Sequence, residues 1–159
     1  MEIVAYQPCY KKDFIALNVA WVEKFFAMEQ ADRDILEHVE EWLDKGAMIF
    51  FAVEENQVLA TCMAQPLGHA VWEICKLAAN EQYQGRGAGK AVFQAAMQYA
   101  IKQGAEKLTL ISNRILKPAL HIYEKFGFQE VPLEKAYWGY DRADIQFEYL
   151  VSAKINAKE

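Results

Sequence analysis

The stretch Glu73-Ile-Cys-Lys-Leu-Ala-Ala79, followed after four residues by Gln84-Gly85-Arg86-Gly87-Ala88-Gly89-Lys90, lies in the middle of the chain. Its first part is mostly apolar and predicts the end of a strand that begins at Val71. The three alternate glycines in its second part let the backbone turn tightly and approach a ligand closely. A helix with free N–H groups is expected to follow, and such a helix end attracts anions. The stretch therefore predicts a strand–loop–helix unit that binds a phosphate or pyrophosphate.

Two familiar phosphate motifs do not match this loop. A Walker loop requires Gly where Gln84 stands and Ser or Thr where Ala91 stands. A dinucleotide fingerprint requires a third Gly where Lys90 stands, and it usually lies in the first strand–helix unit of its fold. The ligand is therefore expected to be neither a Walker-bound nucleotide nor a nicotinamide dinucleotide.

Hydrophobic periodicity on both sides of the loop predicts one domain over residues 1–159, with a mixed central sheet flanked by helices, an α/β (α+β) arrangement. Strands are predicted over residues 1–7, 48–53, 58–64, 71–79, 107–112, 128–131 and 145–151. Helices are predicted over 11–27, from an N-cap at Asp32 to Gly46, from Ala88 to Gly104, and from Pro118 to Gly127. Turns are expected at residues 55–56 and 66–68, and a frayed tail at 154–159.

Composition sets limits on the possible functions. The chain is 53% hydrophobic and 25% charged, as in an ordinary globular protein. Its net charge of -5 argues against nucleic acid as a partner, because duplex binding needs clustered Lys and Arg. No apolar run approaches the roughly 20 residues that span a bilayer, and the N-terminus lacks the pattern of a signal peptide. We therefore expect a cytoplasmic protein with no membrane partner.

The three cysteines, Cys9, Cys62 and Cys75, have no metal-ligand spacing, and their number is odd. They are interpreted as reduced core residues of a cytosolic protein without a metal site. Cys75 is a weak candidate for a nucleophile, because no His lies in an obvious partnering position.

Gln84, Gly87 and Gly89 match the pattern Gln/Arg-x-x-Gly-x-Gly/Ala, which resembles the pyrophosphate loop of the GNAT superfamily of N-acetyltransferases. A second match is a short helix that leads into Tyr-x-x-x-Gly-Phe, here Tyr123 to Phe128. Glu73 lies eleven residues before Gln84, a spacing at which some members, including histone acetyltransferases, carry a catalytic Glu. The chain thus resembles a small bacterial-type single-domain GNAT protein.

The resemblance implies acetyl-coenzyme A (acetyl-CoA) as a co-substrate, with no metal. Strand backbone is expected to pair with the pantetheine arm, loop amides to hold the pyrophosphate, and strands 73–79 and 107–112 to splay around the thioester. Many members carry an Asn where this chain has Leu116. Asn113, three residues earlier, is therefore the candidate for the cofactor contact that this Asn makes in the family. The expected cofactor contacts are Leu77, Ala78, Ala79, Gln84, Gly85, Arg86, Gly87, Ala88, Gly89, Lys90, Asn113 and Tyr123.

Two side chains are the catalytic candidates. Alkyl amines are protonated at neutral pH, so a base must take a proton, directly or through water. Glu73 is the candidate base, with an ordinary solvent-facing carboxylate or a water relay from other groups as alternatives. Lys76 is expected on the opposite face of the strand by its period of two. An N–H near Leu77 is the candidate oxyanion donor, and Tyr123 the candidate acid for the leaving thiolate, with core packing as its alternative.

The acceptor is expected to meet aromatic and acidic groups. Trp21, Phe25 and Glu29 share one helical face that suits an amine, with a core role for the two rings as the alternative. The segment Tyr137-Trp138-Gly139-Tyr140 precedes a strand without a core pattern and predicts a binding loop. Arg142 could orient a substrate, or pair with Asp144.

Together these features predict an N-acetyltransferase that transfers the acetyl group to a primary amine of a small molecule or amino-acid-like acceptor, by direct attack in a ternary complex. One alternative acceptor is a protein Lys or N-terminus, and an alternative of another class is a non-catalytic acyl-CoA-binding sensor module. A homodimer is possible, with residues 145–151 as an edge strand.

Overall fold

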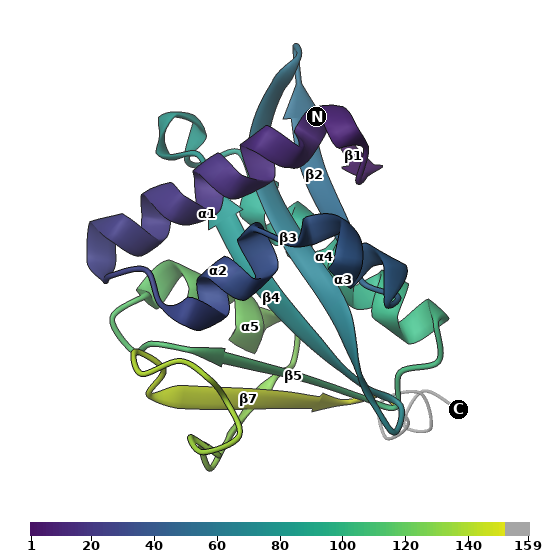
Figure 1. The fold of residues 1–159 in the computed structure, drawn as a ribbon, viewed down its shortest axis with the longest axis vertical. Helices are drawn as coiled ribbons and strands as arrows, with labels where there is room; N and C mark the ends of the chain where they lie inside the picture. The colour runs from purple at the N-terminus through teal and green to yellow at the C-terminus, as the bar shows by residue number, and fades with distance from the viewer. Residues whose placement is uncertain (152–159) are drawn as a thin grey trace.

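The computed structural model describes residues 1–151, and the predicted tail at 154–159 lies outside the described residues. One mixed sheet of seven strands has the order β1-β2-β3-β4-β5-β7-β6, and the expected fold class is confirmed (Figure 1). The strands are β1 (Glu2–Ala5), β2 (Met48–Glu54), β3 (Gln57–Gly68), β4 (Val71–Ala79), β5 (Lys107–Ser112), β6 (Gln129–Val131) and β7 (Ile145–Leu150). The helices are α1 (Lys11–Phe25), α2 (Gln30–Leu36), α3 (Val39–Asp44), α4 (Ala88–Lys102) and α5 (Lys117–Lys125).

The helices cover the sheet from both sides. Helices α1, α2 and α3 lie in front of it in Figure 1, and α4 and α5 lie behind it. The front layer packs around the fully buried Phe14, Ile49 and Phe51. The rear layer packs around Val92 and Phe93 of α4, with Leu108 and Leu110 of β5. Apolar residues spaced three and four apart on α4 place one stripe against the sheet, which explains why this segment is helical.

The two turns of the first meander use left-handed residues. Glu55 and Asn56 have φ of 49° and 65°, which suits a two-residue hairpin turn. The turn predicted at residues 66–68 lies instead at His69 and Ala70, with φ of 56° and 60°. Pro66 lies in β3 and pairs with Trp72 of β4. On its other side, the β2–β3 ladder has already ended at the pair Met48–Ala64. The missing N–H of Pro66 therefore costs no bond to β2.

The long second helix predicted from an N-cap at Asp32 was wrong in two respects. The segment forms two short helices, α2 and α3, with a break at Glu37 and His38. The N-cap is Glu29, and Asp32 is the third helical residue of a reciprocal capping box. In this box the Asp32 carboxylate accepts from the Glu29 N–H at 2.9 Å. Asp32 therefore points its carboxylate back to the start of α2, toward β4.

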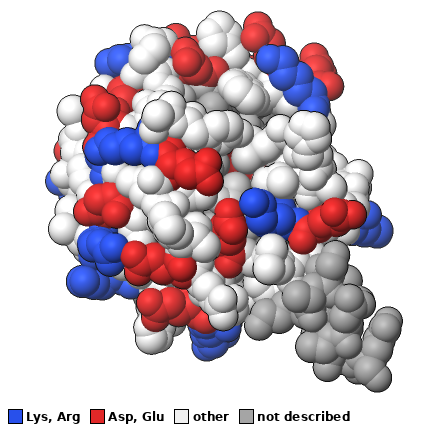
Figure 2. Space-filling view, turned by 90° about the horizontal axis from the view of Figure 1, so that it is seen from below, with Lys and Arg blue, Asp and Glu red and all other residues white. Residues whose placement is uncertain are grey.

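The late strand β7 is not an edge of the sheet, which corrects the expectation that it could supply one for a dimer. It lies between β5 and β6, and over Gln146–Glu148 it pairs on both sides. The outer strands of the sheet are β1 and β6. The acidic and basic side chains of the described residues are interspersed on the face drawn in Figure 2 rather than gathered by sign.

Candidate active site

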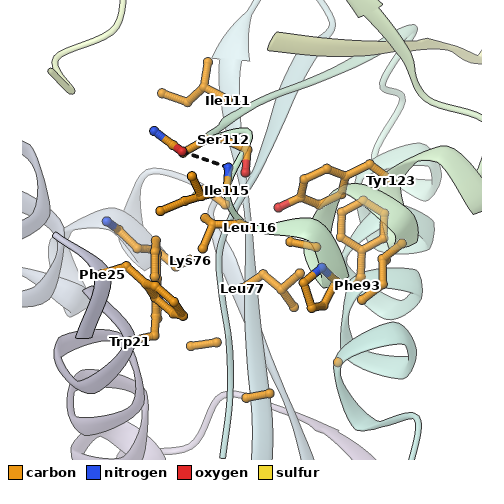
Figure 3. A pocket seen from close by; sticks show the side chains of 18 of the residues that line it. Trp21, Phe25, Lys76, Leu77, Phe93, Ile111, Ser112, Ile115, Leu116 and Tyr123 are labelled. Carbon is orange, nitrogen blue, oxygen red and sulfur yellow. Dashed lines mark hydrogen bonds between the residues drawn. The ribbon is translucent and has the colours of Figure 1, made fainter. Parts of the chain in front are cut away.

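A split between β4 and β5 opens the sheet at its middle. These parallel strands pair only at Val71–Glu73 against Lys107–Thr109, and beyond Glu73 they separate, as predicted. A cavity of about 570 Å³ lies in this split. Its walls come from β4, β5, α1, the start of α4, α5 and residues 140–143. Figure 3 shows Trp21, Phe25 and Lys76 on one side of the cavity, and Phe93 and Tyr123 on the other.

A β-bulge in β4 decides which side chains reach the cavity from each side. Met63 pairs with Cys75 and Thr61 with Ala78, so Lys76 and Leu77 together oppose a single residue of β3. Lys76 has φ of 53°, a left-handed value that is strained for a residue with a side chain. The extra residue turns Lys76 to the α1–α3 face, where it reaches Asp32 on α2. The prediction that Lys76 lies opposite Glu73 was therefore wrong.

Beyond the bulge, β4 keeps one row of backbone groups free of strand pairing. Ala78 and Ala79 pair with β3, whereas no β5 residue pairs with Leu77, Ala78 or Ala79. All three residues line the cavity. Backbone N–H and C=O groups along such an unpaired strand edge can take up an extended ligand.

The glycine loop places the start of α4 at the cavity. Gly85 and Gly87 have φ of 84° and 75°, so both positions favour glycine. Gly87 is the N-cap of α4, and no side chain caps this end, so the N–H groups of its first turn remain available. Gln84 and Gly89 line the cavity. This end of α4 has the properties of an anion site.

The two basic residues of the loop, Arg86 and Lys90, do not line the cavity. Arg86 pairs with Glu54 at 3.1 Å and lies over the ring of Tyr83. Lys90 neighbours Lys125 of α5, and hydrogen bonding and charge repulsion from Lys125 lower the pKa of Lys90. The side chains of Lys90 and Lys125 thus meet beside the first turn of α4.

Tyr123 is held by aromatic packing on the rear side of the cavity. Its ring contacts Phe93 and Phe147, with ring centroids 5.4 and 5.6 Å apart. The hydroxyl is turned toward the split in Figure 3. Burial raises the pKa of Tyr123 above its usual range, and hydrogen bonding with Ser112 offsets this only in part. The hydroxyl therefore carries its proton at neutral pH.

Glu73 lies where the strands begin to separate. Its side chain is buried and lines the cavity. It accepts a hydrogen bond from Nε2 of Gln65, the residue of β3 with which Glu73 pairs. Burial raises the pKa of Glu73 to about 7, while the Gln65 hydrogen bond and the charge of Lys76 lower it in part. The Oε1 atom of Gln65 is buried without a hydrogen-bond partner in the described part of the chain. Glu73 is thus partly ionised at neutral pH, as a base requires.

Cys62 is buried, whereas Cys9 is exposed, so the prediction of a core position was wrong for Cys9. Cys75 lines the cavity, on the same side as Glu73. Burial, with repulsion from Glu73 adding to it, raises the pKa of the Cys75 thiol well above its usual range. A protonated thiol is a poor nucleophile.

The front wall of the cavity is aromatic. Trp21 and Phe25 of α1 line it as predicted, together with Phe26 and Tyr140. Trp21 is oriented by a hydrogen bond from its Nε1 to Asn18 Oδ1 at 3.3 Å, and Asn18 is buried. Phe25 is 44% exposed, so this wall reaches the surface.

Behind the aromatic wall lies an ion-pair network centred on Asp32. The Asp32 carboxylate accepts from Lys76 at 2.8 Å and twice from Arg142 at 2.7 Å. Burial alone raises the pKa of Asp32, but the hydrogen bonds from Arg142 and the charge of Lys76 outweigh it and hold this pKa well below its usual range. Lys76 also donates to Tyr140 Oη at 3.0 Å. The network joins three segments that lie far apart in the sequence.

The acceptor residues expected from the sequence divide into two groups. Trp21, Phe25 and Arg142 line the cavity. Glu29 does not line it, because its carboxylate binds the guanidinium of Arg142 and the backbone N–H of Asp141. Tyr137 and Trp138 lie outside the lining, and Tyr137 is 61% exposed. Trp138 donates instead to Gln146 at 3.2 Å.

Two further polar contacts differ from simple expectation. Arg142 pairs with Asp32 and Glu29 rather than with Asp144, whose carboxylate accepts from the N–H of Arg114 at 2.8 Å. Asn113 lines the cavity, but it donates to the Arg142 carbonyl at 2.7 Å and accepts from the Ile115 N–H at 3.0 Å, the contact dashed in Figure 3.

Three residues in or next to the cavity wall were missed by the sequence interpretation: Gln65, Lys76 and Phe26. Lys76 carried a signal, because a lone charge inside an apolar strand indicates a bulge or a buried partner. Tyr140 lies in the aromatic segment already singled out, but only the tertiary contacts distinguish it from Tyr137. Gln65 depends on the register of β3 against β4, which the sequence pattern does not specify.

No helix in residues 1–151 is both long and apolar enough to cross a bilayer. Within the same residues, no three His, Cys, Asp or Glu side chains gather in a way that could hold a metal ion.

A mixed sheet that splits at a parallel pair, with an uncapped glycine-rich helix start beside the split, defines the fold of acetyl-CoA-dependent acyltransferases. The sequence profile described as the Acetyltransferase (GNAT) family matches residues 12–128. The chain belongs to this family, so the predicted family is confirmed.

Curated relatives carry related names but extend beyond this chain. N-acetyltransferase 8 of Mus musculus is 28% identical over 91 residues, which are 54% of this chain and 40% of that protein. An N-alpha-acetyltransferase of Sulfurisphaera tokodaii is 36% identical over 90 residues, 55% of this chain and 48% of that protein. The chain thus spans less than half of the length of these relatives.

Solved structures share the fold over nearly the whole chain. An acetyltransferase of the GNAT family from Staphylococcus aureus Mu50 superposes with a TM-score of 0.84 at 17% identity, covering 94% of this chain and 98% of that one. The PaiA N-acetyltransferase of Thermoplasma acidophilum, solved in complex with coenzyme A, has a TM-score of 0.72 at 14% identity, covering 94% and 99%.

Proposed function

We propose that this acetyltransferase transfers the acetyl group of acetyl-CoA to a primary amine of a small molecule or amino-acid-like acceptor, by direct attack in a ternary complex. One observation carries the proposal. Glu73 and Tyr123, a carboxyl with a pKa of about 7 and a protonated phenol, reach the same cavity from its two sides. A base and an acid on opposite sides of one reacting carbonyl are what amine acylation without a covalent enzyme intermediate requires.

The first turn of α4 is proposed to hold the pyrophosphate of acetyl-CoA. The N–H groups of Ala88, Gly89 and Lys90 lack side-chain capping, and the helix dipole favours a negative group there. The unpaired backbone of Leu77–Ala79 runs from this loop toward Glu73 and supports a place for the pantetheine arm. Asn113 stays a weaker candidate for a cofactor contact, because both ends of its amide already bind the protein.

The proposed chemistry uses three groups of the chain. Glu73 accepts a proton from the acceptor ammonium, so that the neutral amine can attack the thioester carbon. The N–H of Leu77, on the β4 edge without a β5 partner, donates to the oxygen that becomes negative as the carbon turns tetrahedral. When the carbon–sulfur bond breaks, Tyr123 gives its proton to the leaving thiolate. The surplus proton on the amide nitrogen returns through water to the Tyr123 phenolate, and Glu73 releases the proton that it took to solvent.

The shape of the front wall supports a small acceptor. The segment 140–143 is tied to the start of α2 by the Asp141 N–H bond to Glu29 at 2.7 Å, and by the pairs of Arg142 with Asp32 and Glu29. The rings of Trp21, Phe26 and Tyr140 surround the guanidinium of Arg142. A protein side chain would have to enter past this fixed segment, whereas a small amine fits within the aromatic wall.

The test is an assay of free thiol release from acetyl-CoA with a panel of small amines and amino acids, beside peptides with a free N-terminus or a Lys. We expect release with at least one small amine and slower release with the peptides. A clear preference for the peptides would transfer the proposal to a protein acetyltransferase. Binding of acetyl-CoA without turnover of any acceptor or of water would favour the sensor module instead.

A further inference from the structure

Arg142 occupies the place on the aromatic wall where a cationic acceptor would bind. Its guanidinium carbon lies 4.7 Å from the ring centre of Tyr140, 5.5 Å from that of Trp21 and 5.8 Å from that of Phe26. Rings attract cations through their faces, and here an internal cation already uses this attraction. The aromatic wall therefore does not act as a cage for an ammonium group.

The carboxylates of Asp32 and Glu29, on the same side of the molecule, are also occupied by hydrogen bonds from protein groups. Asp32 is fully buried and accepts four hydrogen bonds, from Lys76, twice from Arg142 and from the Glu29 N–H. Glu29 binds Arg142 and Asp141. Neither carboxylate lines the cavity, whereas Lys76 and Arg142 do. The ion pairs are thus oriented with their cations nearer to the cavity and their carboxylates behind.

Two carboxyls line the cavity among the described residues, Glu73 and Glu81, and Glu81 is paired with Lys24 of α1. Glu73 is needed for the reacting amine, so a second positive charge on the acceptor would find no unpaired counter-ion there. That charge would lie among apolar rings and next to two cations, where both desolvation and repulsion oppose it. The same cations lower the pKa of a single bound amine, which helps it lose its proton to Glu73.

Resting on the proposed function, we infer that the acceptor is a monoamine with an apolar or aromatic body, and that Arg142 is the specificity-determining residue that excludes acceptors with a second positive charge. Trp21, Phe25 and Phe26 contact the apolar body. Lys76 supports Arg142 by sharing the Asp32 carboxylate.

The test compares two amines of equal size in the thiol-release assay: hexylamine, and 1,5-diaminopentane, in which an ammonium replaces the terminal methyl group. We expect kcat/KM for hexylamine to be higher by about a hundredfold or more. In the series from propylamine to hexylamine, each added methylene that is buried should raise kcat/KM by up to about fourfold. A third compound, 6-aminohexanoate, tests whether the two cations recognise an anion instead.

A ratio near one, or a preference for the diamine or for 6-aminohexanoate, would overturn the inference while leaving the acetyltransferase reaction in place. Turnover of other amines of the panel without turnover of hexylamine would overturn it as well. If no amine at all releases thiol, the proposed function itself fails, so the two failures are distinguishable.

The Arg142→Met variant tests the assigned residue. Asp32 keeps Lys76 and the Glu29 N–H as partners in this variant, and the affinity for acetyl-CoA should not change. The hexylamine-to-diamine ratio should fall about tenfold or more, because one repelling cation is lost. Lys76→Met, which leaves both bonds from Arg142 to Asp32 intact, serves as the second variant if the first is unstable. It should lower the ratio in the same direction. An unchanged ratio in the variants that fold would remove the role from these cations.

Discussion

Two titratable side chains flank the cavity, and their surroundings shift the pKa of each. Glu73 is buried beside a neutral amide, and its pKa rises to about 7 because burial opposes ionisation more strongly than Gln65 and Lys76 favour it. Tyr123 is buried among rings, and burial keeps its proton in place. Burial thus shifts the pKa of both side chains upward.

The first prediction concerns the pH dependence set by Glu73. Because the ionised form is the base and its fraction grows as the pH rises through about 7, kcat/KM should rise with pH and level off above that value. Glu73→Gln should remove this limb and lower kcat by about 10² to 10⁴. Steady-state rates from pH 5.5 to 9 measure both effects. The exposed Glu106→Gln is the control, and a limb that persists in Glu73→Gln would point to a different base.

The second prediction concerns Tyr123. Tyr123→Phe keeps the ring contacts with Phe93 and Phe147 but removes the proton donor. We expect kcat to fall by about tenfold to a hundredfold, with the affinity for acetyl-CoA nearly unchanged, since a thiolate leaves fairly easily. Calorimetric titration and rate measurements separate the two quantities. Tyr99→Phe, on α4 and outside the cavity lining, should have no effect on kcat. Equal rates for Tyr123→Phe and the unaltered protein would exclude Tyr123 from proton transfer.

At the level of elements, two local departures from regular geometry build the site. The bulge at Lys76 brings a lysine to the face that meets α2, and the left-handed Gly87 ends the loop so that α4 starts with free N–H groups. Both are backbone features next to the split between β4 and β5. Bulges and left-handed residues often occur at functional sites, where they direct groups toward a ligand.

The third prediction separates the loop's binding role from its backbone strain. Gly87→Ala and Gly104→Ala both place a side chain at a left-handed position, with φ of 75° and 100°, and with nothing near the added atom. Each should cost about 1 kcal/mol of stability. Only Gly87→Ala should also weaken acetyl-CoA binding, by about tenfold, because it alone disturbs the first turn of α4. Thermal unfolding and calorimetric titration of both variants provide the measurements. A similar loss of affinity in Gly104→Ala would argue that general destabilisation is the cause.

In the whole molecule, the split divides the sheet into two parts. Strands β1 to β4 lie on one side of it and β5, β7 and β6 on the other, joined by three residue pairs between β4 and β5 and by the helices. The front and rear side-chain layers both reach the cavity. A ligand in the split would therefore contact both parts of the sheet at once.

The fourth prediction follows from this arrangement. Acetyl-CoA that binds the folded chain alone should stabilise it by about 2.7 kcal/mol at a concentration a hundred times Kd. For a chain of this length, such a gain raises Tm by roughly 5 to 11 °C. Scanning calorimetry with and without acetyl-CoA measures the shift, with adenosine as a control that lacks the pyrophosphate and the pantetheine arm. The absence of any shift at saturating acetyl-CoA would contradict a site in the split.

Most of the elements and the family were predictable from the sequence, because they depend on local signals. Strands β4 and β5 begin and end at the predicted residues, and the glycine loop with Tyr123 and Phe128 identified the family before any contact was known. Predictions failed where a local signal had competing outcomes. The Pro-Leu-Gly stretch suggested a turn, but Pro66 remains in a strand whose neighbour has ended. Asp32 suggested an N-cap, but Glu29 took that position.

The character of the acceptor wall was decided by tertiary contacts. Trp21, Glu29 and Arg142 suggested an aromatic and acidic surface for an amine. In the fold, the guanidinium of Arg142 lies over the Trp21 ring and forms ion pairs with Glu29 and Asp32, so these groups are already occupied. Asp32, Lys76 and Arg142 lie on three distant segments, and a one-residue bulge determines which face of β4 Lys76 uses. Periodicity and motifs describe neighbours along the chain, whereas the charge of a cavity depends on which distant groups pair behind its wall.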